Sequence, residues 1–114
     1  MGSMDSIISA EKIKSTLVLK MQVPRVDMML ARRFRDELRQ HLSEKPMRIV
    51  LDMEIVTHFD SSGMGALKGF MEEVRQTGSQ LILCNLNRSM QMLLKLSQME
   101  AFFEVSDDLT RSVI

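Results

Sequence analysis

One stretch of the chain, residues 48–69, joins three signals that together restrict the fold. It reads RIVLDMEIVTHFDSSGMGALKG: an apolar, β-branched run, the turn Asp60-Ser61-Ser62-Gly63, and an amphipathic pattern typical of a helix. A strand that leads directly into a helix is a building unit of α/β proteins. Serines at a helix start stand beside unpaired backbone N–H groups, where a hydroxyl can cap the helix or carry a phosphate. We therefore expect an α/β domain with its functional site at this junction.

The patterns on either side extend this unit to a whole domain. Strands are expected around Ile7-Ile8 and at residues 16–23, 48–56, 80–85 and 102–105, with a hairpin turn near Glu11-Lys12. Helices are expected from Asp27 to near Pro46, from Ser61 or Ser62 to Gly78, from Asn87 onward, and after Ser106. The order β-β-α-β-α-β-α-β-α predicts a mixed sheet with the strand at 48–56 in its centre.

Apolar stripes indicate which helix faces turn toward the core. In the first helix the stripe follows a four-residue spacing: Val26, Leu30, Phe34, Leu38 and Leu42. In the second helix the inward positions are Met64, Leu67, Phe70, Met71 and Val74.

Composition and charge exclude several classes of function. Fifteen Lys and Arg balance fifteen Asp and Glu, so no overall field attracts nucleic acid or an anionic membrane. No window approaches the roughly 20 apolar residues of a membrane helix, and the N-terminus lacks a signal-peptide pattern. Cys84 stands alone in an apolar run, which fits a core role in a reducing cytosol. We expect one soluble, cytoplasmic domain over residues 4–114, preferably monomeric, with residues 1–3 a remnant of cloning.

Two catalytic interpretations of the central turn are disfavoured by spacing. Gly63, Gly65 and Gly69 are one residue too widely spaced for the dinucleotide-binding fingerprint. Ser61 lies in no G-x-S-x-G motif and has no arranged acid and histidine partner, as a hydrolase nucleophile requires. We therefore expect no enzymatic activity.

Other polar residues have plain structural interpretations. Asp52 and Glu54 could mimic a paired carboxylate site, but at a strand end we expect them to be exposed or salt-bridged. His58 fits a loop or packing role, and His41 fits the end of the first helix. Because no second histidine lies near either one, the sequence predicts no metal and no cofactor.

The strand, DSSG turn and helix of residues 51–67 resemble a STAS domain of the bacterial anti-sigma factor antagonist type. That family has an apolar strand ending in LD, a short connector, and DSSGLG opening an amphipathic helix. Residues 80–87 and 90–105 look like its following strand and loop, third helix and next short strand. The resemblance covers about residues 16–114 and implies the STAS fold, a mixed central sheet with helices packed mainly on one face.

The resemblance also implies a function. In that family the serine directly after the Asp, by position Ser61 here, is phosphorylated by a partner anti-sigma factor, an ATP-dependent serine kinase. The unphosphorylated antagonist binds this kinase and releases its sigma factor, and a PP2C-type phosphatase restores that form. The expected partner-binding residues of this chain are Asp60, Ser61, Ser62, Gly63 and Met64, flanked by Arg25 and Asp27.

This sequence departs from the family pattern in two places. Val23-Pro24-Arg25 stands where many members have Gly or Asp, and the last helix is cut short at Ile114. The first departure concerns the loop that would face the partner. An alternative interpretation is a STAS-type interaction module in a pathway without a sigma factor, such as a transporter, sensory or lipid-trafficking complex, with Ser61 only a cap.

Overall fold

The computed structural model describes residues 6–98 and 104–106 of the chain. Its elements are β1 (Ile8–Ile13), β2 (Thr16–Met21), β3 (Arg25–Val26), α1 (Ala31–Gln40), the 3-10 helix η2 (His41–Glu44), β4 (Arg48–Asp52), β5 (His58–Phe59), α2 (Ser61–Thr77), β6 (Gln80–Cys84), α3 (Arg88–Leu96) and β7 (Glu104–Ser106).

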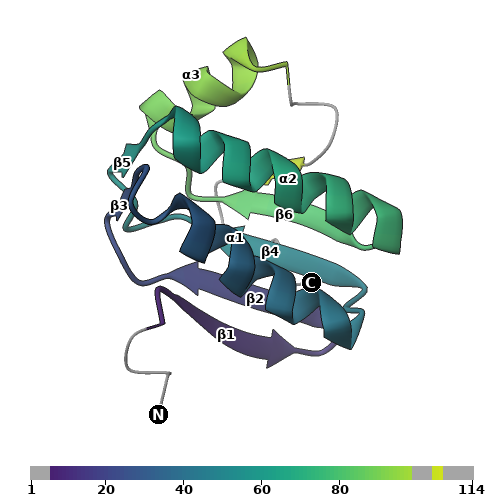
Figure 1. The fold of residues 1–114 in the computed structure, drawn as a ribbon. Helices are drawn as coiled ribbons and strands as arrows, with labels where there is room; N and C mark the ends of the chain where they lie inside the picture. Colours follow the sequence, from purple (N-terminus) through teal and green to yellow (C-terminus); the bar gives the residue numbers. More distant parts are fainter. Residues whose placement is uncertain (1–5, 99–103, 107–114) are drawn as a thin grey trace.

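Five strands form the main sheet in the order β1-β2-β4-β6-β7. β1 is antiparallel to β2, and all other neighbours are parallel. α1 and α2 lie side by side across one face (Figure 1), and the buried Met90 and Leu94 of α3 join the same core. The predicted mixed α/β fold, with β4 at its centre, is confirmed.

Alternation along β4 divides its side chains between the two faces of the sheet. Ile49 and Leu51 join the large core beneath the helices. Val50 points to the opposite face and joins a smaller buried cluster that includes Cys84. The predicted core role of Cys84 is thus confirmed.

The first hairpin turns later than the sequence predicted. Glu11 and Lys12 are paired with β2 inside strand β1, and the chain reverses at Lys14 and Ser15. Lys14 has a φ of 57°, the left-handed conformation that short hairpin turns require. Two charged residues in a row, Glu11 and Lys12, led to the prediction of a turn. They lie instead in an edge strand, where charged side chains are exposed to solvent.

α1 begins at Ala31 and not at Asp27. Oδ1 of Asp27 accepts a hydrogen bond from the backbone N of Met29 at 3.0 Å, so Asp27 caps a separate turn before the helix. Leu30 at the N-cap makes no side-chain capping bond. In this turn the backbone N of Leu30 and that of Ala31 both donate to the carbonyl oxygen of Asp27, at 3.0 and 2.9 Å, and the regular helix begins only after it. Within α1, Phe34 and Leu38 are buried as predicted.

β4 ends at Asp52, four residues before the predicted end. The expectation that Asp52 is exposed or salt-bridged is wrong, because its side chain is buried. Its Oδ1 accepts hydrogen bonds from the backbone N of Glu54 and from Nδ2 of Asn85, both at 3.0 Å. These bonds offset the cost of removing the carboxylate from water.

The end of α2 and the start of α3 lie where the sequence predicted them. Gly78 ends α2 with a φ of 81°, and Oδ1 of Asn87 caps α3 by accepting from N of Met90 at 2.9 Å. β7 overlaps the strand predicted at 102–105. The first two residues of that prediction, and the helix predicted after Ser106, lie outside the described residues.

Candidate functional site

A small second sheet, which the sequence did not predict, positions the candidate site. β3 and β5 pair in parallel, with Arg25 opposite His58 and Val26 opposite Phe59. The carbonyl oxygen of Pro24 also accepts a hydrogen bond from the backbone N of His58 at 3.1 Å. The loop that precedes α1 is thereby held against the segment that leads into α2 (Figure 1).

Asp60 caps the N-terminus of α2. Its Oδ1 accepts hydrogen bonds from the backbone N of Ser62 at 2.9 Å and of Gly63 at 3.0 Å. The prediction that α2 starts at the serines is confirmed. The cap itself is the carboxylate of Asp60 and not a serine hydroxyl, because Asp60 already pairs with the N–H groups that a cap satisfies.

Ser61 is the first residue of α2, and its side chain is exposed. No described residue is hydrogen-bonded to its hydroxyl. The hydroxyl therefore faces solvent at the positive end of a 17-residue helix, where the helix dipole favours a negative charge. A group-transfer enzyme can reach it without unfolding the domain.

Gly63 locks the first turn of α2 onto β3. A Cβ at this position would lie 3.0 Å from the carbonyl oxygen of Val26 and 3.2 Å from Cε1 of Phe59. Only glycine permits so close an approach to backbone. The ring of Phe59 in turn meets that of Phe34 edge-on at 5.9 Å. The base beneath Ser61 is therefore closely packed.

Two exposed methionines flank the site, and the sequence analysis did not single them out. Met28 is 75% exposed and Met29 is 83% exposed, on the turn that Asp27 caps. Large flexible apolar side chains suit an adaptable protein contact. The sequence did contain a signal for them: both are large apolar residues, yet neither lies on the four-residue stripe that faces the core.

The predicted partner-binding residues differ in their accessibility. Arg25 and Ser61 are exposed, Asp27, Asp60 and Ser62 are half-buried, and Gly63 and Met64 are buried. Met64 is only 6% exposed and belongs to the core cluster, so it offers little surface to a partner. β3, β5 and the start of α2 bring these residues to one edge of the molecule.

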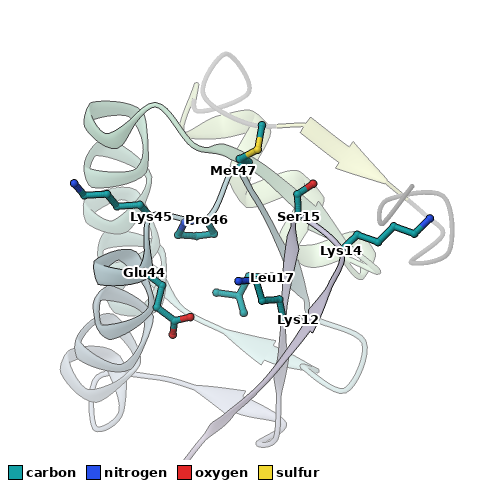
Figure 2. Close-up of a pocket in the computed structure, with 8 residues that line it drawn as sticks. All are labelled: Lys12, Lys14, Ser15, Leu17, Glu44, Lys45, Pro46 and Met47. Atoms are coloured by element: carbon teal, nitrogen blue, oxygen red, sulfur yellow. The ribbon is translucent and has the colours of Figure 1, made fainter.

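Other parts of the described chain offer less chemistry. A pocket of about 210 Å³ lies beside the starts of β2 and β4 (Figure 2). Ser61 follows the other end of β4 along the chain, after β5. The side chains of Lys14 and Lys45 point away from the pocket, and its volume is below the roughly 300–1,000 Å³ usual for small-molecule sites. No cluster of three or more His, Cys, Asp or Glu suited to a metal occurs within residues 6–98 and 104–106. In these same ranges, no helix has the length and apolar character to cross a membrane.

A comparison with protein families decides how this arrangement is classified. A sequence model of the STAS domain matches residues 8–111. The chain belongs to the STAS domain family. The resemblance noted in the sequence is therefore confirmed, and the mixed sheet with helices on one face is the fold of this STAS domain.

Solved structures with the same fold include anti-sigma factor antagonists. SpoIIAA in its unphosphorylated form has a TM-score of 0.70 and 19% identity, with 91% of each chain covered. The Bacillus cell fate determinant SpoIIAA in its phosphorylated form has a TM-score of 0.69 and 19% identity, covering 91% of this chain and 95% of that one. An antagonist from Mycobacterium paratuberculosis has a TM-score of 0.80 and 15% identity, covering 92% and 88%. At these low identities, the similarity to these solved structures shows that the fold is shared.

Proposed function

We propose that this STAS protein is an anti-sigma factor antagonist that works by partner switching. Its unphosphorylated form binds an anti-sigma factor that is a serine kinase and so releases the sigma factor; phosphorylation at Ser61 ends that binding. The observation that carries the proposal is the exposed hydroxyl of Ser61, which no described residue hydrogen-bonds, on a closely packed helix start. The solved neighbours in phosphorylated and unphosphorylated forms support it.

Electrostatics at the start of α2 explain how a phosphate would act. It adds about −1.5 to −2 charges at pH 7. The helix dipole favours that charge, but the neighbouring Asp60 carboxylate opposes it and already accepts from the N–H groups of Ser62 and Gly63. The phosphate therefore projects outward and blocks a partner by bulk, repulsion and desolvation cost, while the domain stays folded.

The proposed partner surface is the edge formed by residues 60–64 together with Arg25 and Asp27, extended by Met28 and Met29. ATP is bound by the partner kinase, and a PP2C-type phosphatase removes the phosphate. The STAS protein itself contributes no catalysis and no cofactor, and acts in the cytoplasm. Its chemical contribution is one modifiable hydroxyl on an otherwise fixed surface.

A capture experiment with four baits tests this function. Wild type, Ser61→Ala, Ser61→Asp and Ser62→Ala are incubated with native cytoplasmic extract and ATP, and the baits and bound proteins are analysed by mass spectrometry. Wild type and Ser62→Ala should gain phosphate on Ser61. Ser61→Ala should retain a serine kinase, and Ser61→Asp should retain at least about tenfold less, because a charge mimics the blocked state.

Two results would contradict the proposal. One is phosphate on Ser62 with Ser61 unmodified. The other is equal capture of the same partner by Ser61→Ala and Ser61→Asp, which would instead favour an interaction module in a pathway without a sigma factor. Far-ultraviolet circular dichroism of all four baits checks that each remains folded.

A further inference from the structure

Three glycines lie inside α2, and two of them have a neighbour that explains the missing side chain. At Gly63 a Cβ would come within 3.0 Å of the backbone oxygen of Val26. At Gly69 it would come within 3.0 Å of the guanidinium carbon of Arg35, whose side chain crosses α2 there. Packing within this chain therefore accounts for both residues.

Gly65 has no such explanation. It is exposed, and no described atom beyond its own helix lies within 4 Å of the position a Cβ would occupy. It does not need a left-handed conformation, because the positive φ among the described glycines is that of Gly78. A glycine inside a helix is less stable than alanine because it loses more conformational freedom on folding. Its stability cost is therefore not offset by any described contact.

The position of Gly65 indicates what the bare backbone serves. Residues four apart lie on the same face of a helix, so Gly65 stands one turn beyond Ser61 on the face that carries the hydroxyl, about 6 Å along the axis. A protein segment that lies along this face while it reaches the Ser61 hydroxyl therefore rests against Gly65.

We propose that Gly65 is a positioning residue for the kinase that modifies Ser61: its missing side chain lets a segment of the kinase lie against the α2 backbone and align the hydroxyl. This inference rests on the proposed function. The occupant is the kinase itself, because the bare surface is continuous with the residue that the kinase modifies. A methyl group at position 65 holds the kinase segment away from the helix and misaligns the hydroxyl.

The test combines thermal unfolding with kinetics of the serine kinase captured by Ser61→Ala and then purified. Gly65→Ala should raise the unfolding midpoint by about 3–6 °C, since alanine favours the helix. It should lower the rate of Ser61 phosphorylation, and the affinity for the kinase, at least about tenfold, as an ill-fitting extra carbon does in a close contact. Gly65→Leu should lower both further.

Gly69→Ala is the matched control, with the same chemical change one turn farther from Ser61. There the new methyl group meets the flexible end of Arg35, and phosphorylation should stay within twofold of wild type. Equal rates for Gly65→Ala and wild type would overturn the inference and leave the proposed function standing. Equal losses in both alanine variants would also overturn it, because helix stiffness alone would then explain them. Wild type left unmodified by the kinase would overturn the function and the inference together.

Discussion

At the scale of residues, Asp60 decides how α2 begins. One of its oxygens accepts from two backbone N–H groups, and this arrangement leaves the hydroxyl of Ser61 out of the helix's own hydrogen bonding. The sequence placed the turn correctly because Asp, Ser and Gly favour turns and caps. It could not show which of three adjacent polar side chains makes the cap, since all three suit that position.

Replacing Asp60 tests the cap. Asp60→Ala should lower the free energy of unfolding by about 1 kcal/mol, because the N–H groups of Ser62 and Gly63 lose their acceptor. Asp60→Asn keeps an acceptor oxygen and is the matched control, with a loss of a few tenths of a kcal/mol. Urea unfolding followed by circular dichroism measures both; equal losses in the two variants would show that charge, not the cap, matters.

At the scale of elements, Glu37 ties α1 to the start of β1. Its carboxylate accepts hydrogen bonds from the hydroxyl of Ser6 at 2.7 Å, the backbone N of Ile7 at 3.1 Å and Nε of Arg33 at 2.9 Å. Burial raises the pKa of Glu37, but the hydrogen bonds and the charge of Arg33 outweigh it and bring the pKa below its ordinary value of 4.5. The charged carboxylate therefore stabilises the junction between helix and strand.

This lowered pKa predicts a pH dependence with a definite sign. Because the pKa is lower in the folded state, the stabilisation is complete above about pH 4.5 and is lost as the pH falls through the folded-state pKa. Glu37→Gln should be less stable than wild type at pH 7, and the difference should shrink below pH 4.5. Urea midpoints measured from pH 3 to pH 7 test this; a constant difference would contradict it.

The elements also show what a sequence can and cannot predict. α2 was predicted well because a long amphipathic period and the terminal Gly78 are local signals. β3 and β5 were not predicted because a strand of two residues is too short to show alternation of apolar and polar positions. Each forms only by pairing with the other, which lies far away in the sequence. The burial of Asp52 likewise depends on a distant residue, because the amide of Asn85 that donates to it lies 33 positions away in the sequence.

At the scale of the whole molecule, β4 connects the core to the site. It is the central strand of the main sheet, its side chains enter both apolar clusters, and the chain beyond it leads through β5 to Ser61. The family resemblance alone singled out Ser61 as the proposed phosphorylation site, because physical patterns left it as one of several possible caps. The support beneath that serine, from Val26 and Phe59, is formed by distant residues and could not be predicted from local patterns.

A core truncation measures how much this connection matters. Leu51 is fully buried in β4, and Leu51→Ala should cost about 2–5 kcal/mol, because it removes apolar contacts and leaves a cavity. That is a large share of the 5–15 kcal/mol typical of a domain's total stability. Leu96→Ala, at a position 75% exposed, is the control and should change stability by less than about 0.5 kcal/mol. Chemical denaturation gives both values, and similar losses would contradict the assigned core.

The doubly occupied oxygen of Asp60 has a consequence for how long the switched state lasts. A phosphoryl group on Ser61 finds the amides of Ser62 and Gly63 already bonded to Asp60, so these two groups neither hold it nor shield it from attack. We expect the lifetime of the phosphorylated form to depend on the amount of phosphatase in the cell and not on contacts between the phosphate and the domain. A phosphate that the fold does not protect is open to rapid dephosphorylation, which suits a signal that must follow changing conditions.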